Sequence, residues 1–372
     1  MVFLLTGLFL YSAYAGLLLF YWKWWGRVKE YKPVNESVTT TKLSVVVAAR
    51  NEEKNILQLL EALHEQTCPQ SNFEVLVVDD HSTDATASLV QQFRAPNVRL
   101  LSLPAGMTTK KRAIQWGIDR ATGDYIIATD ADCRPARTWL QTLASFQSEE
   151  QSCFIAAPVV LDVRGVLLDR FQALDFLMLQ AITAASVSAG FHSLCNGANL
   201  AYSKEAFREV HGFDQIDQVA SGDDMLLMYK IQKRHPQQVH YLKSSRAIVH
   251  TQPMPTWGAF LQQRIRWSGK TLFYDDKKVF YALLVVYFFN VYFFILGFAG
   301  FWNLHYWYAL LLLWILKAAV EWPLVSSAAT FFQQRKLLRY FFFFQPLHII
   351  YVVMIGLLSQ FLKYEWKGRK LK

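Results

Sequence analysis

Two aspartates, Asp130 and Asp132, stand one residue apart at the end of an apolar run in the segment DYIIATDADC. Carboxylate oxygens are hard ligands of the kind that Mg²⁺ or Mn²⁺ prefers, and such an ion can bridge the phosphates of a nucleotide. A solvated turn explains most isolated Asp-x-Asp matches. Because this pair follows a run typical of a buried strand, we interpret it as a metal site that stabilises a leaving diphosphate.

A second acidic pair, Asp223 and Asp224, opens the segment GDDMLLMYKIQKR. Acids in the first turn of a helix complement the helix dipole, which is a purely structural explanation. The functional interpretation makes one of them a general base beside an acceptor hydroxyl, since an acid near phosphates and metal has reason to remain ionised. Position alone does not decide between the two acids.

A third group of polar side chains, QQRIRW at 262–267, precedes the last apolar block of the chain. Arg266 can hold a pyrophosphate through two parallel hydrogen bonds, and Trp267 offers a flat face to a sugar ring. An interfacial amphipathic helix explains the same residues, and both interpretations can hold together. The histidines His81, His211 and His250 lack the spacing of a metal cluster, so we expect structural or peripheral roles for them. Of the three, His250 is the main candidate for a functional role.

The elements that must position these groups alternate between short apolar runs and amphipathic segments. Strands are predicted at 43–49, 73–80, 97–104 and 124–132, and helices at 52–66, 110–122 and after Ser82 or Thr83 as cap. The alternation predicts an α/β fold with a mostly parallel sheet and helices on both faces. Such sheets bind ligands at the carboxyl ends of their strands.

Four carboxylates are therefore expected at one edge of the sheet, those of Asp79, Asp80, Asp130 and Asp132. The adjacent sequence supplies no cation to neutralise them, so a bound ion or ligand is expected there. Further along, the spacing predicts a long helix over 164–190, a loop into a strand at 195–202, and a short helix capped by Ser203.

Membrane segments are predicted at both ends of the chain, where its 53% hydrophobic and 15% aromatic residues are concentrated. Residues 2–22 carry no charge and are long enough to cross a bilayer. A cleaved signal peptide is the alternative, given the small residues of SAYAG, but there is no basic region before the apolar run. Three more spans are predicted at 279–299, 304–327 and 340–362, with Lys317, Glu321 and Pro323 in the second of these and Pro346 interrupting the third.

The net charge of +9 belongs to the flanks of these segments. Residues 1–32 carry +3 and residues 279–372 carry +7, which leaves −1 for the middle of the chain, so no nucleic-acid-binding face is expected. The Lys and Arg residues after the first span place the middle region in the cytoplasm. The basic tail KYEWKGRKLK disagrees with four full spans, so the last segment is re-entrant or interfacial, or one span is wrong. The four scattered cysteines are then unpaired core residues.

Taken together, ARNEE (49–53), VVDDHSTD (77–84), TDADC (129–133), SGDDM (221–225) and QRIRW (263–267) resemble the family 2 glycosyltransferases. The similarity is to their membrane-embedded branch, which includes cellulose, chitin, hyaluronan and poly-N-acetylglucosamine synthases. It implies a GT-A fold, which is a Rossmann-like α/β domain, and inverting transfer from a nucleotide sugar with Mg²⁺ or Mn²⁺.

The resemblance also implies roles for single residues. On the donor side, it implies that the nucleotide sugar contacts Asn51, Glu52, Asp79 or Asp80, Lys110, Asp130, Asn196 and Gly197, with Asp130 and Asp132 at the metal. On the catalytic side, it implies that Asp224 of the Asp223-Asp224 pair is the base, Trp267 supports the acceptor, and Arg266 and Gln263 assist the leaving nucleotide. The family glycine that directly precedes the lysine is missing here, because Thr109 precedes Lys110.

The sequence thus predicts an integral protein of a bacterial plasma membrane with five regions. These are an anchor (1–26), a linker (27–42), a cytoplasmic GT-A domain (43–257), an interfacial segment (258–278) and a C-terminal membrane region with about three helices (279–372). The expected partners are a nucleotide sugar in its UDP form, a polysaccharide or lipid-linked acceptor, the bilayer, and other polysaccharide-export subunits.

Three alternatives stay open at this point. A single-addition glycolipid synthase of the ceramide-glucosyltransferase type would use the same motifs. A non-catalytic subunit would only bind the nucleotide sugar. A metal-dependent phosphatase or nucleotidyltransferase would also use an Asp-x-Asp strand end.

Overall fold

The computed structural model describes residues 2–33, 41–191, 194–216, 222–269, 277–361, 364–366 and 369–371. The chain divides into two compact units. The first, which we call the sheet unit, comprises Val28–Asp162, Ser193–Gln252 and Glu365–Lys372, and the second, the helical unit, comprises Met1–Arg27, Val163–His192 and Pro253–Tyr364. Most of the predicted linker, at 34–40, and part of the interfacial segment, at 270–276, lie outside the described residues.

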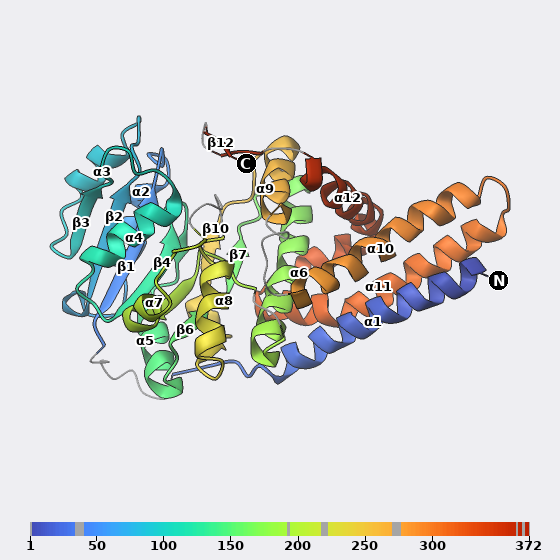
Figure 1. The fold of residues 1–372 in the computed structure, drawn as a ribbon, viewed down its shortest axis with the longest axis horizontal. Helices are drawn as coiled ribbons and strands as arrows, with labels where there is room; N and C mark the ends of the chain where they lie inside the picture. The colour runs from blue at the N-terminus through green and yellow to red at the C-terminus, as the bar shows by residue number, and fades with distance from the viewer. Residues whose placement is uncertain are drawn as a thin grey trace. The chain divides into compact units, whose positions relative to one another are not determined.

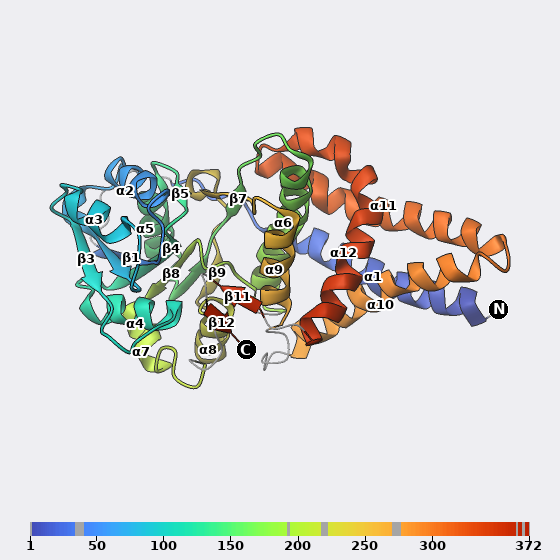
Figure 2. The same ribbon diagram turned by 90° about the horizontal axis from the view of Figure 1, so that it is seen from above.

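The sheet unit is built on a seven-stranded sheet with the order β3-β2-β1-β4-β8-β6-β9. Its first four strands are β1 (Leu43–Ala49), β2 (Phe73–Asp79), β3 (Val98–Ser102) and β4 (Tyr125–Asp130), and they pair in parallel. The helices between them are α2 (Ile56–His64), α3 (Thr86–Gln92) and α4 (Lys110–Arg120). Figures 1 and 2 show α2 and α3 on one face of this half of the sheet and α4 on the other.

The register of the parallel strands brings their acidic ends to one edge. Ala48 of β1 pairs with Asp130, and the next residue, Ala49, pairs with Asp79 of β2. Behind this edge, β1, β2 and β4 are apolar and almost fully buried. The burial of their nonpolar side chains stabilises the sheet. The charges at the strand ends are therefore held by a rigid core.

Gly117 lets α4 approach the sheet closely. A Cβ at this position would lie 2.5 Å from Cγ1 of Val46 in β1 and 3.1 Å from Cγ2 of Val78 in β2, which is too close for any larger residue without a shift of the helix. The close packing fixes the height of α4 over β1 and β2. The packing thereby also holds Lys110, the first residue of α4, near the carboxyl ends of these strands.

The other half of the sheet is antiparallel where it joins the first. Strand β8 (Leu200–Ser203) runs antiparallel to β4 and to β6 (Phe154–Ala156), and β9 (Val239–Tyr241) is parallel to β6. A second sheet of three short strands has the order β5-β10-β7, with β5 at Arg134–Pro135, β7 at Val159–Leu161 and β10 at Val249–Thr251. The sheet unit also contains α5 (Trp139–Glu150), α7 (Lys204–Glu209) and α8 (Met225–Arg234), and its tail pairs β11 (Tyr364–Trp366) with β12 (Arg369–Leu371).

The helical unit contains the apolar helices. They are α1 (Val2–Arg27), α6 (Leu167–Ala189), α9 (Trp257–Ser268), α10 (Lys277–Ala299), α11 (His305–Phe331) and α12 (Phe341–Phe361), with the 3₁₀ helix η4 (Arg335–Tyr340) between the last two. Among the described residues, five of these helices are long and apolar enough to cross a membrane, namely all but α9. The N-terminal span and the three C-terminal apolar helices were predicted as membrane segments. Helix α6 was predicted only as a long helix, and it is also long and apolar enough to cross a membrane.

Three of the helices run along one another. Phe3 of α1 packs edge-on against Tyr306 of α11, and Trp25 at the other end of α1 packs against Phe331, so α1 and α11 are parallel. Helix α10 runs antiparallel to them in the same bundle, whereas both figures draw α12 across their long axes. Neither proline ends its helix, because α11 continues through Pro323 and α12 continues through Pro346.

The charged residues of α11 are neutralised inside the helical unit. The ammonium of Lys317, which is fully buried, lies 2.5 Å from Oε1 of Glu321 and donates to Oε1 of Gln345 in α12 at 2.6 Å. The Gln345 amide donates to Glu321 at 2.6 Å, and the hydroxyl of Tyr14 in α1 donates to the same carboxylate. These bonds satisfy an ion pair that an apolar surrounding would otherwise make very costly.

Candidate active site

Lys110 brings the two acidic motifs of the sheet unit together. Its Nζ lies 2.6 Å from Oδ1 of Asp130 at the end of β4 and 3.0 Å from Oδ2 of Asp223. The expectation that no cation neutralises the strand-end acids was wrong for Asp130, because Lys110 reaches it from the start of a helix earlier in the chain. The sequence could not show this, since the pairing depends on how α4 lies over the sheet.

The electrostatics of this cluster favour the charged lysine. Burial alone would lower the pKa of Lys110, but the carboxylates of Asp130, Asp223 and Asp224 outweigh it and hold the pKa well above its ordinary value. The lysine side chain is 22% exposed, and that of Asp130 is 37% exposed. A fixed positive charge is therefore open to a ligand from the solvent side, next to a carboxylate.

Asp224 is oriented by the backbone. It caps α8, where Oδ1 accepts from the N–H of Met225 at 2.7 Å, while Oδ2 accepts from the N–H of Gly197 at 3.2 Å. Gly197 is closely surrounded, because a Cβ at this position would lie 3.1 Å from Nζ of Lys110 and 3.4 Å from Oδ2 of Asp223, so a larger residue would displace the ammonium. Gly197, which was predicted to contact the sugar, thus lies against the acidic pair and the lysine.

Asn199 anchors the loop that carries Gly197, and the sequence analysis missed it. Its fully buried amide accepts from Nε1 of Trp139 at 2.9 Å and donates to the carbonyls of Pro158 and Ala247 at 2.8 and 2.9 Å. The loop is also held by Asn196, whose Oδ1 accepts from the N–H of Ala198 at 2.9 Å. The Asn-x-x-Asn spacing of NGAN was visible, but the burial of its second member depends on α5.

The residues expected at the nucleotide link two loops at the sheet edge. Asn51, in the left-handed conformation that asparagine tolerates, accepts from the N–H of Thr83 at 2.8 Å and donates its own N–H to Ser82 at 3.0 Å. Glu52 donates its backbone N–H to Thr86 at 2.7 Å. These bonds hold the loop after β1 against the loop after β2.

The acids at the end of β2 lie deeper than expected. Asp79 is 9% exposed and accepts from the N–H of Ser82, and Asp80 is 2% exposed. Neither Ser82 nor Thr83 caps α3, because the helix begins one turn later and Asp84 accepts from the N–H of Thr86. A nucleotide role for Asn51, Glu52, Asp79 and Asp80 stays a prediction.

Thr109 replaces the family glycine and adopts a glycine-like backbone. Its φ is 110° and its ψ is 148°, a conformation that residues with a Cβ rarely enter. Its hydroxyl accepts from the N–H of Arg112 at 3.4 Å and so caps α4. The backbone geometry that a glycine would supply before Lys110 is thus present, at the cost of local strain.

The chemistry of the Asp-x-Asp motif fits a hard divalent cation. Potential ligand atoms of Asp130, Asp132 and Cys133 lie within 4.8 Å of one another. Cys133 is buried, and burial together with the charges of Asp132 and Asp130 raises the pKa of its thiol well above the ordinary value, so the thiol stays protonated. The two carboxylates are the groups of this set that match Mg²⁺ or Mn²⁺.

His250 belongs to a second polar cluster, on the three-stranded sheet. Its Nδ1 lies 2.7 Å from Oδ1 of Asp162, and the guanidinium of Arg134 lies 3.1 Å from Oδ2 of the same acid. Burial would raise the pKa of Asp162, but the His250 and Arg134 bonds lower it. Arg134 is the first residue of β5 and follows the Asp-x-Asp motif by two residues. The cluster therefore fixes the position of β5 directly after the motif.

The residues of QQRIRW lie on α9 in the helical unit. Thr256 caps the helix, and Phe260 and Arg264 are buried on one side of it. Gln263, Arg266 and Trp267 are half-buried on the neighbouring side, and one face of Trp267 stacks on Arg264 at 4.3 Å. The helix is therefore fixed by its own unit, and the predicted catalytic residues on it are partly exposed.

A buried ion pair that the sequence analysis missed holds α9. The guanidinium of Arg264 lies 2.7 Å from Oδ2 of Asp175 in α6, and these side chains are only 4% and 8% exposed. Nε2 of His348 in α12 lies 3.7 Å from the other oxygen of Asp175. The sequence did contain a signal for this ion pair, because Asp175 lies inside the apolar run ALDFLM. A buried carboxylate requires a charged or hydrogen-bonding partner.

The sequence of the sheet unit matches a known family. Residues 44–210 match the model of the glycosyl transferase family 2. Over these residues the chain is similar to a family 2 glycosyltransferase domain. The matched segment holds the parallel strands, the Asp-x-Asp motif and the loop of Gly197, and the chain's central α/β sheet agrees with the GT-A fold.

Individual relatives agree with this assignment. The chain is 25% identical over 234 residues to the probable glycosyltransferase YdaM of Bacillus subtilis, covering 61% of this chain and 54% of that protein. It is 35% identical over 114 residues to the poly(ribitol-phosphate) beta-N-acetylglucosaminyltransferase TarS of Staphylococcus aureus, covering 30% of this chain and 20% of TarS. The chain thus spans about half or less of these relatives.

The fold of the chain, including its apolar helices, has a solved counterpart. The mannosyltransferase PcManGT from Pyrobaculum calidifontis superposes with a TM-score of 0.63 over 95% of this chain and 98% of that one, at 18% identity. At this identity the similarity concerns the fold alone.

Proposed function

We propose that this protein is a membrane-bound inverting glycosyltransferase that moves a sugar from a UDP-sugar to a glycan or lipid-linked acceptor. The observation that carries the proposal is the contact of Lys110 with both Asp130 and Asp223. It joins the motif expected at the donor diphosphate to the acidic pair expected at the acceptor, within 3.0 Å on each side.

Asp224 acts as the general base in this proposal. Its carboxylate takes the proton of the acceptor hydroxyl, whose oxygen attacks the anomeric carbon while the bond to the diphosphate oxygen breaks on the opposite face. The electron pair of that bond leaves with the nucleoside diphosphate. Asp224 suits this role because two backbone N–H groups orient it, whereas Asp223 is held by the ammonium of Lys110.

Lys110 and the helical motif serve the leaving group. The ammonium of Lys110 meets the diphosphate charge, and Arg266 and Gln263 assist it, with Trp267 supporting the acceptor sugar. Asn51, Glu52, Asp79 and Asp80 shape the nucleotide side, and Asn196 and Gly197 lie by the sugar.

Asp130 and Asp132 are the residues that would hold a Mg²⁺ or Mn²⁺ ion. Such an ion supplies charge stabilisation to a diphosphate. The presence of Mn²⁺ with GDP-mannose in PcManGT supports a divalent ion in a protein of this fold.

The arrangement of the helical unit supports a topology with three spans. Helices α1, α10 and α11, with 26, 23 and 27 residues, are long enough to span, and α12 crosses them. With three spans and an interfacial α12, the basic tail stays on the cytoplasmic side, as the distribution of Lys and Arg requires. The tail residues Glu365–Lys372 also belong to the sheet unit.

A single-addition glycolipid synthase is the second candidate, because three spans give little room for a polysaccharide channel. Methanococcus voltae has a transferase, named for a dolichyl N-acetylglucosaminyl phosphate acceptor, that is 25% identical over 177 residues. Product length separates the two candidates.

The test is a panel of UDP- and GDP-sugars offered to the purified full-length chain with Mn²⁺. We expect release of nucleoside diphosphate with one donor and its loss on chelation. No release with any donor, together with phosphate release from a generic phosphoester, would favour the phosphatase alternative. Binding of a nucleotide sugar without turnover would favour the non-catalytic subunit.

A further inference from the structure

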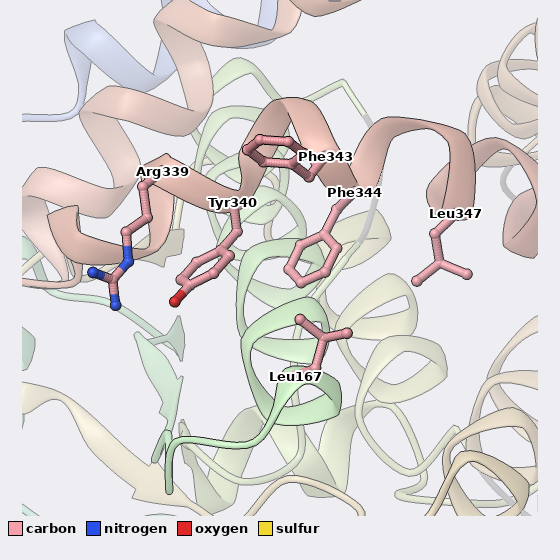
Figure 3. A pocket seen from close by; sticks show the side chains of 6 residues that line it. All are labelled: Leu167, Arg339, Tyr340, Phe343, Phe344 and Leu347. Carbon is pink, nitrogen blue, oxygen red and sulfur yellow. The ribbon is translucent and has the colours of Figure 1, made fainter.

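An open groove of about 620 Å³ lies in the helical unit, between the start of α6, η4 and the start of α12 (Figure 3). It takes no part in the proposed reaction. Its lining residues are Leu167, Arg339, Tyr340, Phe343, Phe344 and Leu347.

One end of the groove is apolar and open. Phe343 is 81% exposed and Leu167 is 57% exposed, on two different helices that face the same space. Leu347 extends this surface one turn further along α12. Exposure of large apolar side chains is unfavourable in water. It is favourable where the side chains contact the hydrocarbon core of a bilayer.

The other end of the groove is cationic. The guanidinium of Arg339 lies 4.8 Å from the ring centre of Tyr340, and that of Arg170, on α6, lies 4.7 Å from the same ring. One aromatic ring thus gathers two positive charges from two helices. Tyr340 also stacks on Phe344, with ring centres 5.9 Å apart, which ties the charged end to the apolar wall.

No carboxylate among the described residues is paired with either of these two charges. The nearest acid on α6, Asp169, is fully buried and is held by Arg164 through two bonds of 3.1 Å. Within the described part of the chain, neither Arg170 nor Arg339 pairs with a carboxylate. An anion would relieve the repulsion between them.

The groove lies at the end of the helical unit where α1 and α11 finish, which the proposed topology places at the cytoplasmic face. Trp25, at the end of α1 that leads into the sheet unit, packs against Phe331 at the end of α11, and η4 begins four residues later. Basic pockets between apolar helices on this side of a membrane are suited to lipid head groups. A water-soluble anion would use the charged end and leave the apolar wall exposed.

We propose that the groove binds a bilayer lipid whose head group carries a phosphate. The phosphate lies between Arg339 and Arg170, and the chains lie along Phe343 and Leu347. This inference does not depend on the proposed transfer reaction, so either can fail alone.

The test compares two lipids that differ only in phosphate. Dioleoyl phosphatidic acid and dioleoylglycerol are titrated onto the full-length chain in detergent, and bound lipid is counted by native mass spectrometry. We expect phosphatidic acid to bind at least about tenfold tighter, the factor that one or more charge-assisted hydrogen bonds supplies. Arg339→Ala and Arg170→Ala should each remove about that factor, and Arg335→Ala, on the same 3₁₀ helix but outside the groove, should not.

A second pair of variants tests the apolar wall. Leu347→Trp fills the groove and should abolish binding, whereas Leu357→Trp, at an exposed position of the same helix outside it, should leave binding unchanged. Equal binding of the two lipids, or equal losses in the Arg339 and Arg335 variants, would overturn the proposal. Full displacement of phosphatidic acid by inorganic phosphate would assign the site to a soluble anion instead.

Discussion

Replacing Lys110 by methionine separates its role at the donor from a merely structural one. Methionine keeps the length and helix propensity of the side chain and removes the charge. In the resting site the ammonium occupies Oδ1 of Asp130 at 2.6 Å, so a metal ion that binds Asp130 has to displace this bond. A charge-assisted hydrogen bond contributes about 1.5–3 kcal/mol, and the partial exposure of both side chains favours the lower value.

Lys110→Met should therefore change two affinities in opposite directions. Without nucleotide, Mn²⁺ should bind roughly tenfold tighter because its competitor is gone, since 1.4 kcal/mol is a factor of ten. UDP should bind roughly tenfold more weakly because a phosphate partner is gone, and turnover should fall at least as much.

Calorimetry with Mn²⁺ and with UDP measures both affinities, and Arg112→Met on the same helix is the matched control. Unchanged UDP affinity in the Lys110 variant, or weaker Mn²⁺ binding, would refute the reasoning that Lys110 lies between the metal and the diphosphate.

Three further predictions concern residues that stabilise the site or the sheet that carries it. Thr109→Gly should relieve the strain at φ 110° and raise the thermal unfolding midpoint by a few degrees, about 1 kcal/mol after the lost cap, and a lower midpoint would mean that the cap outweighs the strain. The pKa of Glu74 is lowered although burial opposes it, because bonds from Thr122 and Ser44 and the charge of Arg99 favour the carboxylate. Its stabilisation is therefore complete above its unfolded pKa and is lost as pH falls through the lower folded value, so melting between about pH 5 and pH 3 should be steeper for the native chain than for Glu74→Gln, and equal slopes would contradict this. Asp175→Asn should leave Arg264 buried without its counter-charge, lower turnover at least about tenfold through α9 and keep UDP affinity within about twofold, whereas equal loss of both would indicate general misfolding.

The first half of the sheet could be predicted because its strands consist mainly of short apolar runs that alternate with amphipathic helices. The predicted strand 43–49 coincides with β1, in which six of seven residues are buried. Lys110 was identified through the resemblance to the family, whereas the close approach of Gly117 to Val46 became visible only in the structure.

The short strands of the second half of the main sheet and of the three-stranded sheet could not be predicted in the same way. Strands β6, β7, β9 and β10 have three residues each, too few to show an alternating pattern, and they pair with partners far away in the chain. The direction of α12 was also hidden, because hydropathy reports the length of an apolar helix and carries no information about its tilt. The meeting of Lys110 with Asp223 depends on both halves at once.

The most direct test of the proposed mechanism is sugar transfer by Asp224→Asn. Asparagine caps helices about as well as aspartate, so α8 should keep its start and the variant should lose only the charge and the base. With the donor found in the panel, we expect nucleoside diphosphate release to fall by at least about a hundredfold, while metal-dependent UDP binding stays within about twofold and Asp119→Asn, an exposed charge on α4, behaves as the native chain. Transfer at the native rate by Asp224→Asn would contradict the assignment of the base.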